Sequence, residues 1–322
     1  MTDIKNVLVV GAGTMGSSIA MVFAANGYKT VMADIKQEFI DRAFTQVDKS
    51  IAWMKENDLL SSDDYENAVK ANLTGILNGE IPARGKEFDL VIEVVPENKH
   101  IKRSTYEMLS ESCREDCIFA SNTSGMDVFS LTDSFLKNPS RLVITHWFNP
   151  PYLMKIIEVV QGPKTADAVG DKMREVLESC GKKPSVLRKY IPGFIVNRLA
   201  TAICRELYYM IEQGWVSAQD AENALKYTDG LRWSFEGPIE LWDFVGHEIT
   251  LAVAGDVIPT LCNATDKFPL ADEIFRTGHT GVRAGEGVLK KYTGDFDAYV
   301  AKRNSRILTM YKVMNKFEEE DK

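Results

Sequence analysis

The chain has 322 residues, of which 45% are hydrophobic and 26% are charged, and its formal net charge is −8. This length predicts about two domains, and the acidic balance argues against a nucleic-acid-binding protein, because such proteins present a basic face. No apolar run is long enough to span a membrane and no signal-peptide region follows Met1, so we expect a cytoplasmic protein. The five cysteines are scattered without metal-ligand spacing, which predicts reduced thiols and no metal site.

Short β-branched runs alternate with helical periods in the first half of the chain. That alternation is typical of βαβ units, and it predicts an α/β fold with a doubly wound parallel sheet. Strands are expected at 6–10, 29–34, 89–95, 118–121, 142–148 and 155–160, with helices at 14–26, from about 37, at 98–113 and at 165–180.

The strand pattern ends near residue 190, after which the chain is almost wholly helical in pattern. Helices are expected at 195–213, 218–226 and 239–254, followed by a polar, partly helical tail. The change of period predicts a doubly wound N-terminal domain over residues 1–190 and an all-helical C-terminal domain over residues 191–322.

Three glycines, Gly11, Gly13 and Gly16, follow the first predicted strand in G-x-G-x-x-G spacing. In a Rossmann domain the first permits a tight turn, the second lets a pyrophosphate approach, and the third lets helix and strand pack closely. A tight turn without a ligand is the alternative. The second strand, however, ends in Asp34, at the separation expected for an acid that binds the adenosine ribose. Residues 1–190 are therefore predicted to be a Rossmann domain that binds a dinucleotide.

Asp34 also predicts which dinucleotide binds. A carboxylate at this position would face the extra phosphate of NADP, and two unit charges ~4 Å apart at an effective dielectric near 20 repel by about 4 kcal/mol. NAD is therefore the expected cofactor, although Lys36 is close enough in sequence to weaken the discrimination.

His146 and Glu158 are titratable residues in two predicted strands that are otherwise rich in apolar residues. A lone buried charge is costly unless another polar group satisfies it. Two unrelated structural residues are one interpretation, with the histidine bonded to a carbonyl. A histidine that titrates near neutrality also suits a general base, and a carboxylate can orient its ring and stabilise the imidazolium. The pair is thus a candidate for proton transfer.

Six segments extend a family resemblance over nearly the whole chain. They are the glycine loop, VPENKHIK (95–102), SNTS (121–124), HWFNP (146–150), PGFIVNR (192–198) and GPIELWDFVG (237–246). Together they resemble the L-3-hydroxyacyl-CoA dehydrogenase family. The resemblance implies a Rossmann domain, a helical domain that dimerises, and an active site in the cleft between them, where hydride passes between NAD and a 3-hydroxyl or 3-keto carbon.

The resemblance also implies roles for individual residues. His146 corresponds to the catalytic base and Glu158 to its partner, while Ser124 and Asn197 correspond to the groups that contact the reacting oxygen. Alternatives are an ordinary turn serine for Ser124 and a helix-capping or helix-crossing residue for Asn197. The family's NAD contacts correspond to Glu97, Lys102, Asn149 and Arg283, the last replacing a lysine with a different geometry.

The chain departs from the family where relatives contact coenzyme A. Those relatives carry a lysine-rich stretch on the helix after the ribose-binding acid, whereas this chain has KSIAWMKENDLLSSDD (49–64), with Lys49 and Lys55 as its lysines. Phosphates bind best to Arg, Lys or free N–H groups, so this helix is a poorer site for coenzyme A.

A second departure, TDGLRWSFEGP (228–238), resembles relatives that act on free small molecules, such as gulonate, carnitine or pyridine-carboxylate dehydrogenases. Arg232 is a candidate for binding a substrate carboxylate, with a surface arginine as the alternative, and Tyr152 offers an aromatic contact.

The predicted function is an NAD-dependent dehydrogenase, as a homodimer, acting on a small hydroxy acid, with a CoA-free substrate favoured. One alternative is an L-3-hydroxyacyl-CoA (3-hydroxybutyryl-CoA) dehydrogenase. Another, of a different class, is a crystallin-like NAD-binding structural protein.

Overall fold

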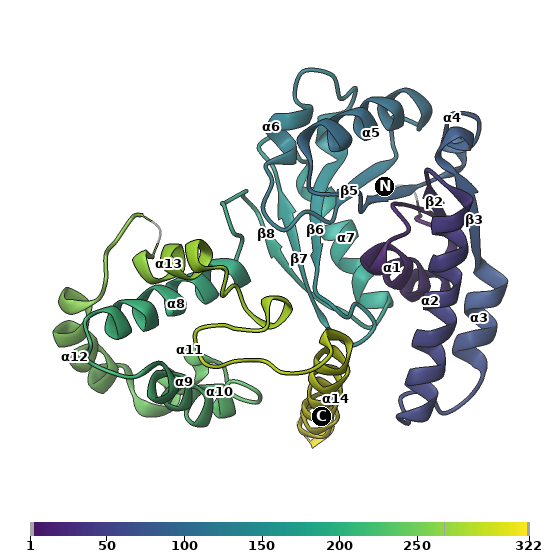
Figure 1. The fold of residues 1–322 in the computed structure, drawn as a ribbon. Coiled ribbons are helices and arrows are strands. Elements are labelled where there is room, and N and C mark those ends of the chain that lie inside the picture. Colours follow the sequence, from purple (N-terminus) through teal and green to yellow (C-terminus); the bar gives the residue numbers. More distant parts are fainter. Residues whose placement is uncertain (1–2, 267, 321–322) are drawn as a thin grey trace. The chain divides into compact units, whose positions relative to one another are not determined.

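The computed structural model describes residues 3–266 and 268–320 (Figure 1). The chain divides into two compact units, Met1–Ile195 and Val196–Lys322. Among the helices of the described residues, none is both long and apolar enough to cross a membrane.

The first unit is built on one eight-stranded sheet with the order β3-β2-β1-β4-β5-β6-β7-β8. The strands are β1 (Asn6–Val10), β2 (Lys29–Asp34), β3 (Leu73–Leu77), β4 (Leu90–Glu93), β5 (Ile118–Ser121), β6 (Leu142–Trp147), β7 (Ile156–Gln161) and β8 (Lys183–Leu187). Pairing is parallel from β3 through β6, β7 runs antiparallel to β6, and β8 runs parallel to β7. The predicted doubly wound α/β fold is confirmed.

Helices cover both faces of the sheet, as Figure 1 shows for the purple to teal part of the chain. They are α1 (Thr14–Ala25), α2 (Gln37–Glu56), α3 (Asp64–Asn72), α4 (Ile81–Arg84), α5 (Lys99–Ser112), α6 (Val128–Thr132) and α7 (Asp167–Ser179). Apolar residues of α1, α2, α3 and α7 pack in one core cluster and those of α4, α5 and α6 in another. Alternate residues of the central strands point into the two clusters, because successive side chains of a strand face opposite ways.

Two strands and three α-helices of this unit were not predicted from the sequence: β3, β8, α3, α4 and α6. Both strands lie at the two edges of the sheet. Edge strands have one bonded neighbour and are partly exposed, so their residues lack the long apolar run that marks the central strands.

The second unit is helical, with α8 (Val196–Glu212), α9 (Ala218–Tyr227), α10 (Asp229–Arg232), α11 (Pro238–Val245), α12 (His247–Val257), α13 (Pro269–Thr277) and α14 (Phe296–Glu320). The expectation of one continuous helix over 239–254 is wrong. Gly246 has φ +98°, a conformation that favours glycine and ends α11 before α12 begins. The tail that was expected to be partly helical contains α14, a helix of 25 residues.

Candidate functional site

The glycine loop connects β1 to α1 in a shape that excludes side chains at two positions. Gly11 has φ +104°, and a Cβ there would lie 2.6 Å from the Val94 carbonyl oxygen. A Cβ on Gly16 would lie 1.8 Å from the Gly11 carbonyl oxygen. A Cβ on Gly13, in contrast, would meet nothing within 4 Å, so its surface is open to a ligand. This arrangement fits a pyrophosphate on the N-terminus of α1, where N–H groups and the helix dipole favour an anion.

Asp34 ends β2 beside this loop. Its Oδ2 accepts a hydrogen bond from the Ala12 N–H at 2.7 Å, and its Oδ1 accepts one from the Ile35 N–H at 2.7 Å. Each carboxylate oxygen retains a second lone pair that could accept a ribose hydroxyl. Since β1 has β2 on one side and β4 on the other, the loop also lies where chain connections diverge, the usual place for a ligand crevice in such sheets.

One cavity of about 800 Å³ follows this edge of the sheet, within the size range of cofactor sites. Its lining includes the predicted residues Gly11, Gly13, Gly16, Asp34, Glu97 and Ser124. Lys102 and Asn149 are not among its described lining residues, and Asn149 is an exposed residue of the segment after β6.

Lys102 is buried inside the sheet unit. Its side chain is 1% exposed, and its Nζ contacts Glu93 Oε1 at 2.7 Å and Glu97 Oε2 at 3.1 Å. Glu97 also accepts a hydrogen bond from Thr123. Burial raises the pKa of Glu97, but Thr123 and the charge of Lys102 outweigh that effect and hold the pKa below its usual value. Lys102 therefore orients a lining carboxylate, and its contact with NAD stays a prediction.

Sequence reasoning missed Glu93, the centre of this network. The carboxylate is 1% exposed and accepts hydrogen bonds from the Val95 N–H at 2.9 Å, Ser121 Oγ at 2.7 Å and Tyr106 OH at 3.3 Å, besides Lys102. An acid within the apolar run DLVIEVV was the signal that could have found it.

His146 and Glu158 are brought together by the β6–β7 pair. They are direct partners in the antiparallel register, and His146 Nδ1 lies 2.8 Å from Glu158 Oε2. The Ile195 N–H donates to Glu158 Oε1 at 2.7 Å. His146 is 5% exposed and Glu158 is fully buried, and the Phe148 and Phe194 rings lie 4.5 and 5.5 Å from the imidazole centroid. The pairing expected from the sequence is present as a buried, hydrogen-bonded dyad.

The loop after β5 contacts the strand that carries His146 and also lines the 800 Å³ cavity. Asn122 Oδ1 accepts a hydrogen bond from the Trp147 N–H at 2.9 Å, and both Asn122 and Ser124 line the cavity. Because Trp147 is adjacent to His146, this loop connects the cavity to the strand that carries the histidine.

The remaining predicted residues belong to the helical unit. Asn197 is the second residue of α8, two residues after Ile195 in the chain. Arg283 has its guanidinium carbon 3.8 Å from the centroid of the Phe296 ring. Arg232 is paired with Asp229 at 2.7 Å, with both side chains partly exposed, an arrangement that surface arginines commonly show.

The end of α2 provides little for a phosphate. Lys55 Nζ contacts Asp63 at 2.5 Å and Glu66 at 2.5 Å, so both acids already neutralise it. Trp53 packs against Tyr152 with ring centroids 6.0 Å apart, and both rings border the core of the sheet unit. Tyr152 is thus a packing residue here, where the sequence suggested a substrate contact.

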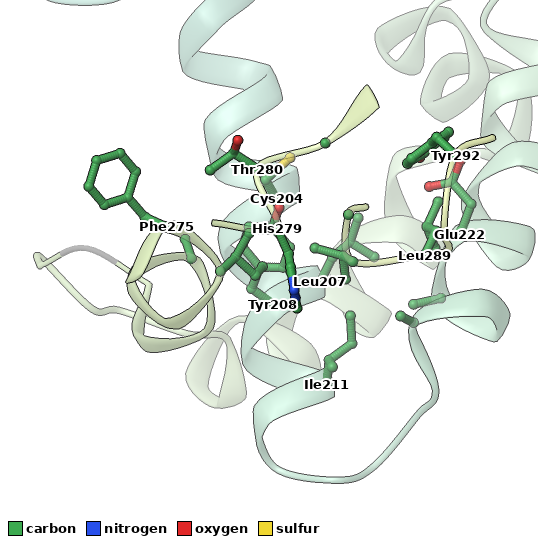
Figure 2. A pocket seen from close by; sticks show the side chains of 17 residues that line it. Cys204, Leu207, Tyr208, Ile211, Glu222, Phe275, His279, Thr280, Leu289 and Tyr292 are labelled. Carbon is green, nitrogen blue, oxygen red and sulfur yellow. The ribbon is translucent and has the colours of Figure 1, made fainter. Parts of the chain in front are cut away.

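A separate cavity of about 460 Å³ lies within the helical unit (Figure 2). Side chains of α8, α9 and α13 line it, including Leu207, Tyr208 and Ile211, with His279 among its polar residues. It contains none of the predicted site residues, so its size alone does not connect it with the chemistry.

Comparison with known proteins gives two family matches. Residues 6–190 match the 3-hydroxyacyl-CoA dehydrogenase NAD binding domain, and residues 193–291 match the 3-hydroxyacyl-CoA dehydrogenase C-terminal domain.

Individual relatives agree with these matches. A 5-formyl-3-hydroxy-2-methylpyridine 4-carboxylate 5-dehydrogenase of Mesorhizobium japonicum is 30% identical over 313 residues, which cover 97% of this chain and 98% of the relative. A 3-hydroxybutyryl-CoA dehydrogenase of Clostridioides difficile is 30% identical over 246 residues, or 76% of this chain and 84% of the relative.

Among solved structures, a 5-formyl-3-hydroxy-2-methylpyridine 4-carboxylic acid 5-dehydrogenase, an NAD+-dependent dismutase, is similar with a TM-score of 0.85 and 29% identity, covering 97% of this chain and 99% of that one. These relatives are enzymes, which favours catalysis over the crystallin-like alternative. The chain belongs to the 3-hydroxyacyl-CoA dehydrogenase family and is an NAD-dependent dehydrogenase acting on a CH–OH group.

Proposed function

We propose that this dehydrogenase interconverts a small, CoA-free hydroxy acid and its keto form, with His146 and Glu158 as the proton-transfer pair. The observation that supports the pair most directly is the 2.8 Å contact between His146 Nδ1 and Glu158 Oε2 across adjacent strands.

The hydrogen-bond pattern supports a separate role for each residue of the pair. An ionised carboxylate can only accept, so Nδ1 carries the proton that faces Glu158 and Nε2 keeps a free lone pair. Nε2 can then take the proton of a substrate hydroxyl, and Glu158 stabilises the imidazolium that forms. In the reverse direction the imidazolium returns that proton to the carbonyl oxygen. The Ile195 N–H holds the second carboxylate oxygen and fixes its orientation.

The cofactor is proposed to contact Gly11, Gly13 and Gly16 with its pyrophosphate and Asp34 with its adenosine ribose. When bound, NAD supplies the hydride acceptor. Glu97, which also lines the cavity, is proposed to contact it, and Lys102, Asn149 and Arg283 remain candidate contacts by resemblance.

Ser124 and Asn197 are proposed to contact the reacting oxygen. Ser124 lines the cofactor cavity. Asn197 is two residues from Ile195, and the covalent connection keeps their Cα atoms within about 7 Å of each other.

The preference for a CoA-free substrate rests on α2 and the residues after it. Lys55 is neutralised by two acids, and Glu56, Asp58 and Asp64 add further negative charge to the same segment. Such a surface repels the phosphates of coenzyme A. The relative from Mesorhizobium japonicum, which aligns over almost the whole chain, is named for a pyridine carboxylate. The alternative, an acyl-CoA substrate, is favoured by the name of the Clostridioides difficile relative.

Arg232 is proposed to bind the substrate carboxylate. Its contact with Asp229 involves one terminal nitrogen, and a guanidinium has five N–H donors, so other donors could bind a carboxylate.

We further propose a cytoplasmic homodimer. The five cysteines are free thiols, as expected in a reducing compartment, and several large apolar side chains of α11 and α12 are exposed.

The proton-transfer role is tested with His146→Asn and Glu158→Gln, both close in shape to the native residues. Turnover of any accepted substrate should fall by roughly 10²- to 10⁴-fold, while NADH binding, followed by fluorescence titration, should remain nearly unchanged. His100→Asn, at an exposed histidine of α5, is the matched control. Full turnover in both test variants would show that His146 is a structural histidine.

A further inference from the structure

Lys182 is a buried lysine that lies outside the cofactor cavity and is not part of the His146–Glu158 pair. The residue lies just before β8 and is 8% exposed. Its Nζ donates to the carbonyl oxygen of Pro151 at 2.6 Å and to that of Met154 at 3.2 Å. It also lies 5.8 Å from the centroid of the Trp147 ring. All three contacts involve the end of β6 or the segment that follows it.

The segment 148–155 connects the strand of His146 to the strand of Glu158. The Leu153 and Met154 N–H groups both donate to the Pro150 carbonyl at 3.0 Å, so the segment forms a turn. Its far end is tied to β8 by the Lys183 N–H, which donates to the Lys155 carbonyl at 2.8 Å. Lys182 adds contacts to the middle of the turn, which has no strand partner of its own.

Burial makes the charged form of the Lys182 side chain unfavourable. Burial lowers the pKa of the Lys182 ammonium to about 8, with Lys155 adding to the decrease and Cys180 opposing it. Both hydrogen bonds go to neutral carbonyls, which compensate a buried ammonium less well than a carboxylate does. A buried cation with a perturbed pKa is a candidate for a functional role.

We propose that Lys182 is a positioning residue for the dehydrogenase reaction. Its ammonium holds the segment 148–155 through two carbonyl groups and thereby keeps His146 aligned with Glu158 across the strand pair. Lys182 acts through the main chain and touches neither substrate nor cofactor. The inference rests on the proposed role of the His146–Glu158 pair.

The test compares Lys182→Met and Lys182→Arg with a matched control, Lys183→Met, in the full-length protein. Lys183 is the neighbouring lysine and its side chain is exposed. NADH oxidation is followed with whichever of acetoacetyl-CoA and acetoacetate reacts. Methionine removes the donors, so kcat should fall by roughly 10²-fold, the size expected for a small displacement of catalytic groups. The KM for NADH and the NADH fluorescence titration should stay unchanged. Arginine keeps charge and donors and should recover most of the lost kcat, while Lys183→Met should match the native protein.

Several outcomes would overturn the proposal: unchanged kcat in Lys182→Met, a loss that Lys182→Arg does not relieve, or a parallel loss of NADH binding. If Lys182→Met does not yield folded protein, Lys182→Gln takes its place, with donors but no charge and the same expected direction. His146→Asn is assayed alongside to separate the two claims. Full turnover in His146→Asn contradicts the proton-transfer role itself. Lost turnover in His146→Asn with native turnover in Lys182→Met contradicts only the role of Lys182.

Discussion

At the scale of single residues, we propose that Asp34 determines the cofactor preference. Both of its oxygens already accept main-chain N–H groups, so the carboxylate is fixed beside the glycine loop. A 2′-phosphate about 4 Å away would be repelled by about 4 kcal/mol at an effective dielectric of 20. Lys36 lies near the ring of Phe39, at 5.7 Å, where it only partly offsets this charge.

We therefore predict that kcat/KM is far higher with NADH than with NADPH for any accepted ketone. Asp34→Ala should reduce that ratio, mainly by improving the use of NADPH. Asp41→Ala, at an exposed acid one turn into α2, serves as the control. Equal use of both cofactors by the native protein would mean that Lys36 dominates.

Lys182 predicts an unusual dependence of stability on pH. Its pKa is about 8 in the folded protein and 10.5 without the effects of folding. Between these values the unfolded chain binds more protons, so this residue makes the protein more stable as the pH rises. Below pH 8 the buried ammonium lowers the free energy of unfolding by its full amount, about 3 kcal/mol for a shift of this size.

The measurement is the free energy of unfolding in urea for the native protein and Lys182→Met at several pH values from 7 to 10. The free energy of unfolding of the native protein, minus that of Lys182→Met, should increase as the pH rises. Taking this difference cancels the titration of groups that the two proteins share. A difference that does not depend on pH would show that folding does not lower the pKa of Lys182.

At the scale of elements, one buried network joins β4, α5 and β5 below the cofactor cavity. Lys102 of α5 lies between Glu93 at the end of β4 and Glu97, and Ser121 of β5 donates to Glu93. Removing one partner of a buried ion pair leaves the other charge uncompensated. The network thus connects the stability of the sheet unit with the orientation of Glu97, a carboxylate that lines the cavity.

Lys102→Met should therefore lower the unfolding free energy by about 3–5 kcal/mol and also weaken NADH binding, because Glu97 loses its orientation. Lys99→Met, at an exposed lysine on the same helix, should change neither quantity. Urea unfolding and NADH titration measure the two effects. A native-like unfolding midpoint for Lys102→Met would contradict the network as described.

Comparison of prediction and structure shows which signals a sequence carries. The central strands and the glycine loop were predictable because apolar runs and glycine spacing are local patterns. The pairing of His146 with Glu158 was also predictable, because a buried titratable group in an apolar strand is costly unless another polar group satisfies it.

The direction of Lys102 was not predictable in the same way. Its segment resembles a cofactor-binding motif, but the buried acid that it contacts, Glu93, lies on strand β4, nine residues earlier. The break at Gly246 was missed because the apolar period continues through it, and only the φ of +98° shows that the helix ends.

At the scale of the whole molecule, several large apolar side chains of the helical unit are exposed on α11 and α12. Ile239 of α11 is 78% exposed and Phe244 is 83% exposed, while Leu251 of α12 is 62% exposed. Side chains of this kind on adjacent helices are typical of a subunit interface.

We predict a homodimer by light scattering at micromolar concentration, and a shift toward monomer in Phe244→Glu. Leu77→Glu, at a partly exposed leucine of the edge strand β3, should leave the mass unchanged. A native protein that is monomeric throughout this concentration range would contradict the dimer.

One NADH-oxidation panel distinguishes a CoA-free substrate from an acyl-CoA substrate. The panel contains acetoacetyl-CoA, acetoacetate, dehydrocarnitine, 3-dehydrogulonate and an aromatic aldehyde, with kcat/KM measured for each. Because Lys55 is neutralised by Asp63 and Glu66, coenzyme A should contribute little binding. At least one CoA-free compound should reach a kcat/KM comparable to or above that of acetoacetyl-CoA, and Arg232→Ala should lower it. If acetoacetyl-CoA alone reacts, and Arg232→Ala leaves its rate unchanged, the chain is a 3-hydroxyacyl-CoA dehydrogenase that requires the thioester.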